Sequence, residues 1–183
     1  MAISILIFVV ATGFIVAVSW RSLGHPRSHG FYRFFAFEGA LILLLLNAHA
    51  WFRDPLSLRQ LIAWGLLLVS AVLPILGFHL LRVAGGPRDE SPPGPDYRFE
   101  RTTQLVTGGI YRYIRHPMYA SLFYLVWGAF LKEITWVTLT VAAVTTFFIY
   151  MTARVEEREN LERFGKSYEE FMGRTRMFIP YIW

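Results

Sequence analysis

The chain has 183 residues, of which 55% are hydrophobic and only 17% are charged, and its formal net charge is +5. A soluble domain of this size does not need so much apolar surface. The apolar residues come in long runs, as they do in helices that cross a lipid bilayer. The sequence has no cysteine, which excludes disulfides, thiolate metal sites and a cysteine nucleophile.

Five apolar runs predict an all-α integral membrane protein with five transmembrane helices. In chain order they are Ala2–Trp20, Phe34–Phe52, Gln60–Leu81, Pro117–Leu131 and Ile134–Ala153. No basic residue leads the first run and Arg21 follows it, so we interpret it as a retained helix and not as a signal peptide. We expect one membrane domain, 1–183, built from three N-terminal spans (1–81), a loop (82–116) and a C-terminal helical hairpin with an amphipathic helix (117–183).

The basic residues predict the orientation of these spans. Fifteen Lys and Arg fall in segments 21–33 and 82–116 and after residue 153, whereas Arg53, Arg59 and Lys132 fall on the opposite side. The positive-inside rule therefore places the N-terminus outside and the long loop and C-terminal tail in the cytoplasm. The basic residues lie close to membrane boundaries, which favours contact with anionic lipids and argues against a nucleic-acid partner.

Polar residues within the runs have several interpretations. Asn47 is expected to form a hydrogen bond between helices. Glu38 lies about one turn inside the second run, where it could line a cavity or reach the interface. His49 and His79 lie near opposite ends of neighbouring runs, which argues against a shared haem.

A further helix is expected after the fifth run. Leu161, Phe164, Tyr168 and Phe171 recur at helical spacing within residues 156–173, with charged residues between them. This pattern predicts an amphipathic helix that lies on the membrane surface or packs over the loop.

The fourth run begins at an unusual junction, Arg115-His116-Pro117. Proline suits the first position of a helix, so His116 is expected at the N-cap, and the free N–H groups behind it favour an anion such as a carboxylate or phosphate. At about 1.5 Å per residue the run is roughly 22 Å long, against a hydrocarbon core of about 30 Å. A polar helix end below the membrane boundary would require a cavity. The alternative is an ordinary interfacial junction with Arg115 on a lipid phosphate.

Two adjacent carboxylates, Glu156 and Glu157, follow the fifth run on the same side. They need a cationic partner, which could be Arg112, Arg115 or Arg154, or a cationic ligand. S-adenosylmethionine carries a carboxylate, an ammonium and a sulfonium, and would suit both this pair and the helix start.

Two segments carry a family resemblance. "LVTGGIYRYIRHPMYASL" at 105–122 and "EERENLERFGKSYEEFMGRTRMFIP" at 156–180 resemble the isoprenylcysteine carboxyl methyltransferase family, in particular its short prokaryotic branch, to which phospholipid N-methyltransferases are related. The resemblance covers about residues 102–180. It implies a bacterial or archaeal inner-membrane enzyme that binds S-adenosylmethionine on the cytoplasmic side and takes a lipophilic acceptor from the bilayer.

The resemblance also implies a set of site residues. Beside that set, Arg115 and Arg154 are our candidate catalytic residues, and a carboxylate acceptor could be held by Arg115 or Arg112. The residues expected to bind the cofactor are Thr103, Gln104, Leu105, Val106, Tyr111, His116, Pro117, Met118, Tyr119, Glu156 and Glu157.

One departure from the family puts the acceptor in doubt. Thr152 stands where the carboxyl methyltransferases carry an arginine, and Arg154 lies roughly 200° further around a helix. Amine, thiol and hydroxyl acceptors remain open beside a carboxylate. Three other hypotheses are a phospholipid N-methyltransferase, a non-catalytic protein that binds anionic lipids, and an NADPH enzyme. The last is considered because sterol reductases share a similar Arg-His-Pro-x-Tyr segment.

Overall fold

The computed structural model describes residues 2–86 and 102–183 of the chain. They form an all-α structure with two short 3₁₀ turns, η1 (Ala48–Ala50) and η2 (Gly109–Arg112). The six α-helices are α1 (Ala2–Leu23), α2 (His29–Leu46), α3 (Leu58–Ala84), α4 (Pro117–Phe130), α5 (Trp136–Phe164) and α6 (Lys166–Arg174).

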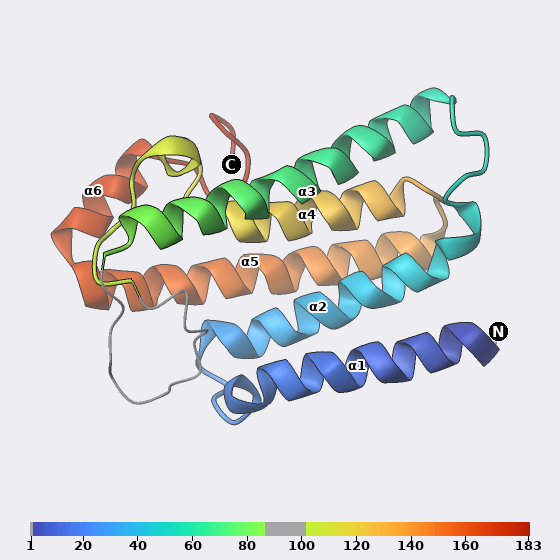
Figure 1. The fold of residues 1–183 in the computed structure, drawn as a ribbon, viewed down its shortest axis with the longest axis horizontal. Helices are drawn as coiled ribbons and strands as arrows, with labels where there is room; N and C mark the ends of the chain where they lie inside the picture. Colours follow the sequence, from blue (N-terminus) through green and yellow to red (C-terminus); the bar gives the residue numbers. More distant parts are fainter. Residues whose placement is uncertain (1, 87–101) are drawn as a thin grey trace.

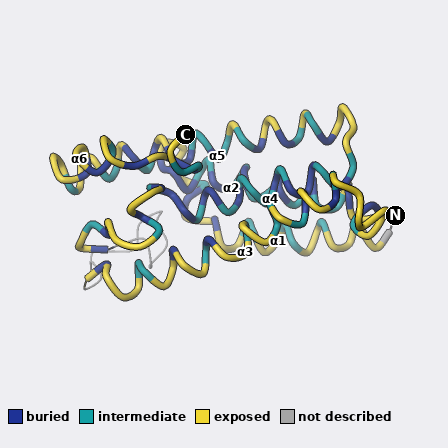
Figure 2. The backbone as a smooth tube through the Cα atoms, turned by 90° about the horizontal axis from the view of Figure 1, so that it is seen from above, coloured by how far each residue is buried: buried dark blue, intermediate teal, exposed yellow. Residues whose placement is uncertain are grey.

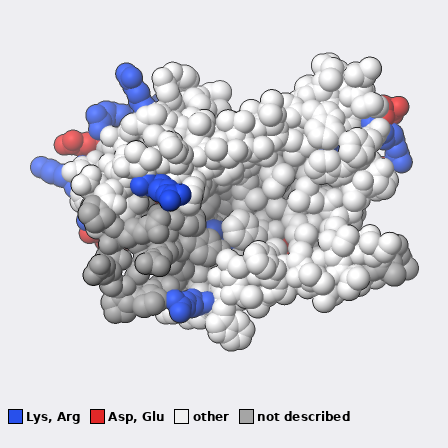
Figure 3. Space-filling model, in the orientation of Figure 1, with Lys and Arg blue, Asp and Glu red and all other residues white. Residues whose placement is uncertain are grey.

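Four of these helices, α1, α2, α3 and α5, are long and apolar enough to cross a membrane. This identifies the chain as an integral membrane protein. The fourth predicted span corresponds to α4, which has 14 residues, fewer than the roughly 20 that a transmembrane helix needs. Figure 3 shows Lys and Arg at the two ends of the molecule and a broad surface without charge between them, as a bilayer requires.

Helices α1 to α5 lie side by side in the order α1, α2, α5, α4, α3 (Figure 1). The short α4 is the central element, because it contacts α2, α3 and α5. Eight of its residues are buried, including Val126 and Ala129. In Figure 2 the exposed residues run along the outer helices, whereas buried residues gather inside the bundle. Protein therefore encloses most of α4, so its ends do not need to reach both membrane surfaces.

The predicted bounds of the second span were wrong. The helix covers His29–Leu46 and not Phe34–Phe52, because Asn47 ends it. The Asn47 amide donates hydrogen bonds to the carbonyl oxygens of Ala129 (2.7 Å) and Glu133 (3.3 Å). The interhelical hydrogen bond expected of Asn47 is thus confirmed. It joins the C-terminal end of α2 to the C-terminal end of α4.

Lys132, expected at the outer membrane boundary, has no exposed surface. Its ammonium donates to Gln60 Oε1 (2.9 Å) and lies 3.5 Å from the ring centre of Trp64. The ring centre of Trp51, which directly follows η1, also lies 5.4 Å from the ammonium. Residues from α3 and from the turn after η1 thereby close the end of α4. Burial, followed by the positive charge of Arg59, lowers the pKa of Lys132.

The predicted amphipathic helix over 156–173 is split in two. Residues up to Phe164 continue α5. Gly165 then ends the helix with a positive φ of 55°, a conformation that glycine adopts without strain. The remainder forms α6, whose Tyr168 and Phe171 are buried. Tyr168 and Phe171 pack against Val106 and Tyr111 of the segment before α4. Of the two arrangements expected for the apolar stripe, the structure thus has the one that packs over the loop.

Candidate functional site

The site is built on the junction before α4. His116 is the N-cap residue and Pro117 occupies the first turn, as expected. The His116 side chain forms no cap hydrogen bond and is instead buried, with 4% of its surface exposed. The N–H of Met118, in the first turn, has no acceptor within the helix, as at any helix start, so this end of α4 suits an anion.

The C-terminal segment holds this junction through its backbone. Ile114 and Arg176 form a parallel bridge. The N–H of Arg115 donates to the Arg176 carbonyl (2.8 Å), and the N–H of His116 donates to the Met177 carbonyl (3.3 Å). This pairing brings residues far apart in sequence together and fixes where α4 begins. No local pattern in the sequence indicates it.

Glu156 and Glu157, from the C-terminal part of α5, flank the His116 ring. Nδ1 lies 3.7 Å from Glu156 Oε1, and Nε2 lies 3.6 Å from Glu157 Oε1. Tyr119 stacks on the ring, with centroids 5.6 Å apart, and its hydroxyl donates to Glu156 Oε2. One histidine is thus placed between two carboxylates in a buried setting.

Charge and burial oppose each other at His116. Burial acts to lower its pKa, but hydrogen bonding and the negative charges of Glu156 and Glu157 outweigh this effect, so the pKa is raised above 6.5. The imidazolium is the cation that partly neutralises the glutamate pair, together with Arg115.

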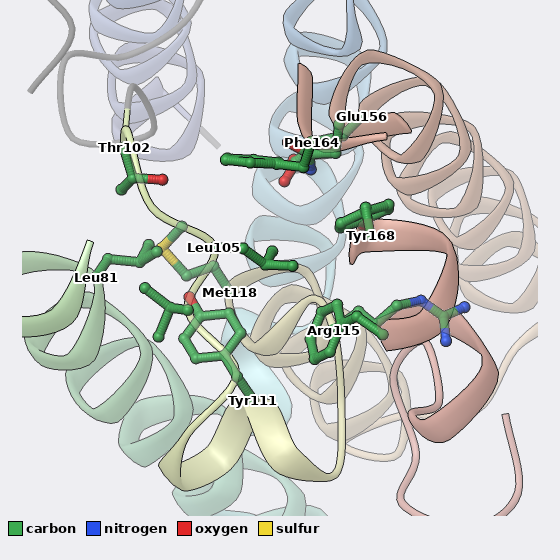
Figure 4. Close-up of a pocket in the computed structure, with 12 residues that line it drawn as sticks. Leu81, Thr102, Leu105, Tyr111, Arg115, Met118, Glu156, Phe164 and Tyr168 are labelled. Carbon is green, nitrogen blue, oxygen red and sulfur yellow. The ribbon is translucent and has the colours of Figure 1, made fainter. Parts of the chain in front are cut away.

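Arg115 and Arg154, the candidate catalytic residues, both contact Glu157. Arg115 Nε donates to Glu157 Oε1 (2.8 Å), while Nη1 donates to the carbonyls of Met172 (3.3 Å) and Thr175. Figure 4 shows its guanidinium pointing away from the pocket. Arg154 is 54% exposed and lies 3.5 Å from Glu157 Oε2. Arg115 therefore links α5 to the end of α6 through groups that are all part of the protein.

A pocket opens beside the junction (Figure 4). Six of the predicted site residues line it: Leu105, Val106, Tyr111, Arg115, Met118 and Glu156. Four further predicted residues are buried and do not line it: His116, Pro117, Tyr119 and Glu157. Thr103 and Gln104 lie next to it, with their N–H groups bonded to the Gly85 carbonyl (3.1 Å each).

Sequence reasoning missed six other lining residues: Leu81, Thr102, Asn160, Phe164, Tyr168 and Phe171. Asn160 could have been found, because it lies four residues after Glu156 and so on the same face of α5. The three aromatic residues were recognised as an apolar stripe, but nothing in the stripe specified a ligand. Burial and then the charges of Glu156 and Glu157 raise the pKa of Tyr168, so its hydroxyl keeps its proton.

The N-terminal helices support the site from outside. His29, the first residue of α2, is buried, and its ring and backbone N–H both contact the Glu159 carboxylate (3.2 Å for the N–H). Glu159 lies one turn beyond Glu156 on α5. Glu38 lines neither this pocket nor the groove described below. It accepts a hydrogen bond from Thr12 of α1 at 2.9 Å.

Comparisons with known proteins find sequence similarity to methyltransferases. Residues 91–167 match the model of a family described as phospholipid methyltransferase. The chain is 35% identical over 72 residues to methanethiol S-methyltransferase 1 of Bradyrhizobium diazoefficiens. It is also 30% identical over 119 residues to a methanethiol S-methyltransferase of Pseudomonas deceptionensis. No solved structure matches the chain significantly.

These similarities cover only part of each protein. The Bradyrhizobium match spans 39% of this chain and 25% of the relative, and the Pseudomonas match spans 65% and 42%. The chain therefore aligns with less than half the length of these curated relatives. The matched family region contains the Arg-His-Pro junction and the glutamate pair. The resemblance to membrane methyltransferases is thus supported, whereas the narrower isoprenylcysteine assignment remains a prediction.

Proposed function

We propose that this protein is a membrane methyltransferase that uses S-adenosylmethionine. The observation that carries the proposal is the pairing, in one pocket, of a helix start suited to an anion with the Glu156 carboxylate suited to a cation. The methionine portion of S-adenosylmethionine presents both charges a few ångströms apart. The family match over residues 91–167 includes both the start of α4 and Glu156.

Each expected cofactor residue has a role that fits its position. The first turn of α4 would hold the carboxylate, and the buried His116 beside it would hold Glu156 and Glu157 in place. Glu156 would hold the ammonium and counter the sulfonium. Tyr111 and Tyr168 offer aromatic walls to the adenine or to the sulfonium. The remaining lining and flanking residues, Thr103, Gln104, Leu105 and Val106, would enclose the nucleoside.

The cofactor would supply an activated methyl group, and the protein would supply alignment. Holding donor and acceptor in line can contribute several kcal/mol to lowering the barrier. Glu157, Arg115 and the C-terminal segment keep the junction rigid, because each contacts the next. Glu157 thus supports the pocket from behind.

We also propose that α4 spans the membrane together with α1, α2, α3 and α5, although it is shorter than they are. In this arrangement the pocket faces the cytoplasm and the N-terminus lies outside. The ends of the bundle support this orientation. The α1–α2 turn, the start of α4 and α6 all lie at one end in Figure 1, where the sequence carries most of its Lys and Arg.

The acceptor is better described as a thiol than as a carboxylate. Thr152, at the position of the family's acceptor-binding arginine, is buried, and its hydroxyl bonds back to the Phe148 carbonyl (2.7 Å). It offers no charge to a carboxylate. The relatives named above act on methanethiol, a small thiol. An aminophospholipid is the second candidate, because of the family description.

Calorimetric titration of the detergent-purified protein with S-adenosylmethionine, S-adenosylhomocysteine and NADPH tests the cofactor. Binding of the first two and silence from NADPH is expected. Glu156→Gln should weaken S-adenosylmethionine binding by about tenfold to a hundredfold, the effect of a lost charged hydrogen bond. Glu162→Gln, an exposed glutamate on the same helix, is the matched control. If a folded sample binds no ligand, the proposal fails and the lipid-binding hypothesis takes its place.

A further inference from the structure

A second, apolar depression lies on the membrane-facing side of α3. Its lining residues from α3 are Pro74, Ile75, Phe78, His79 and Arg82, and Met118 of α4 completes it. We call it the α3 groove. Ile75, Phe78, His79 and Arg82 follow one another at spacings of three, one and three residues, so they form one face of the helix. Ile75 is 68% exposed, which within a membrane means that it faces lipid.

The α3 groove and the cofactor pocket share Met118, which lines both. The two helices approach closely here, because a Cβ on Gly77 would stand 3.1 Å from Pro117 Cγ and 3.6 Å from Met118 Cγ. The Gly77 carbonyl also accepts a hydrogen bond from Tyr111, a residue of the pocket (3.5 Å). A single flexible side chain therefore separates the groove from the site proposed for the methyl donor.

The polar groups of the α3 groove lie toward one end of it. His79 and Arg82 occupy the last turns of α3, nearest the predicted cytoplasmic surface, while Pro74 and Ile75 lie deeper in the membrane. Among the described residues that line the groove, His79 is the one whose side chain carries a ring nitrogen that can act as a general base. Arg82 adds a fixed positive charge, and none of the described residues that line the groove carries a carboxylate.

We propose that the α3 groove is the acceptor site, that the acceptor is a thiol dissolved in the membrane, and that His79 removes its proton. This inference rests on the proposed methyltransferase function. The thiol S–H bond breaks and its proton moves to a ring nitrogen of His79. The thiolate then forms a bond to the methyl carbon, the bond from that carbon to the sulfonium breaks, and its electron pair stays on the sulfur of S-adenosylhomocysteine. His79 afterwards releases the proton to water.

The charge of the α3 groove favours a thiol over the other open acceptors. A neutral thiol enters an apolar groove at little cost, and Arg82 stabilises the thiolate once it forms. A protonated amine would meet the positive charge of Arg82, and no carboxylate among the described lining residues would balance it. A carboxylate is ionised already and would have no use for His79.

Three acceptors with the same tail separate these possibilities: octanethiol, octylamine and octanoate. Transfer of labelled methyl is measured with the full chain in phosphatidylcholine nanodiscs. Octanethiol should be methylated, and octylamine and octanoate should not. His79→Gln should lower kcat/KM for octanethiol at neutral pH by about a hundredfold to ten-thousandfold, as for loss of a general base. The loss should shrink at high pH, where the thiol ionises unaided.

The α3 groove itself is tested by filling it. Ile75→Trp should reduce kcat/KM for octanethiol by about tenfold or more and should affect methanethiol less. Leu76→Trp, an exposed neighbour on another face of α3, is the control and should not change transfer. S-adenosylhomocysteine affinity should be the same in all three substituted proteins, which separates an acceptor defect from a folding or cofactor defect.

Two results would overturn the inference while leaving the methyltransferase proposal intact. One is methylation of octylamine or octanoate in preference to octanethiol. The other is a His79→Gln protein with wild-type transfer and an unchanged pH profile. If the wild-type protein binds neither S-adenosylmethionine nor S-adenosylhomocysteine, both the methyltransferase proposal and the inference are wrong.

Discussion

Replacing Arg115 by methionine is expected to loosen the C-terminal segment as well as the reaction site. Arg115 is nearly buried, with 10% of its side chain exposed, and its partner Glu157 is 3% exposed. The same guanidinium donates to the carbonyls of Met172 and Thr175. Methionine would keep most of the side-chain volume but would leave the Glu157 carboxylate without its nearest cation.

The magnitude follows from this burial. Removing one partner of a buried ion pair costs about 3–5 kcal/mol, chiefly because the other charge stays buried. His116 Nε2, 3.6 Å from Glu157 Oε1, remains as a cation nearby, so the lower part of that range applies. The loss is still a large fraction of a typical stability of about 5–15 kcal/mol. Adding Glu157→Gln should recover part of it, since the orphaned charge is then gone.

Thermal unfolding in detergent, followed by circular dichroism, measures this effect. For a chain of this length, Arg115→Met should lower Tm by on the order of 10 °C. It should also expose the segment after α6 to limited proteolysis. Arg154→Met is the matched control, because that arginine is 54% exposed and contacts the same glutamate at 3.5 Å. Exposed pairs of this kind contribute about 0–1 kcal/mol.

One outcome would refute the structural role. If Arg115→Met keeps the wild-type Tm and proteolysis pattern but loses methyl transfer, the guanidinium acts on the acceptor and not on the fold. The candidate catalytic role predicted from the sequence would then hold in spite of the contacts that Arg115 makes.

Two further predictions concern charges inside the bundle. Because Glu156 and Glu157 raise the pKa of folded His116 above 6.5, its stabilising contribution is complete below that pH and is lost as the pH rises through the folded value. The Tm of the ligand-free protein should therefore fall as the pH rises above 6.5. A His116→Gln protein with the same slope would contradict this. Gln60→Leu removes the acceptor of the buried Lys132 ammonium and should lower the free energy of unfolding by about 1.5–3 kcal/mol. The double variant with Lys132→Met should recover most of that loss. A double variant as unstable as Gln60→Leu would show that the ammonium is not the source of the loss.

Several features of this protein follow from local sequence patterns. Four long apolar runs correspond to four helices long enough to span a membrane, because hydrophobicity and length are properties of each segment alone. Pro117 begins α4 and His116 caps it, because proline restricts the backbone at its own position. The proximity of this junction to Glu156 could also be predicted, since an intervening hairpin returns the chain to the same side of the membrane.

Other features depended on contacts between distant segments. Asn47 ends α2 because its amide finds carbonyls near the end of α4. Lys132 is buried because Gln60 and Trp64 of α3 enclose it. Arg115 turns away from the pocket because the carbonyls at the end of α6 and Glu157 take its donors. In each case the side chain has two or more possible partners, and only the packed bundle decides which lies within reach.

The sequence alone thus determined the class of the protein and the chemical character of its site: an all-α membrane protein with an anion-favouring helix start opposite a glutamate pair. The tertiary structure decided which residues surround that site and what each charge is bound to. The physical reason is range. Hydrophobic periodicity, proline geometry and helix starts act within a few residues, whereas ion pairs, buried amides and shared walls such as Met118 form between helices whose order in space differs from their order in the chain.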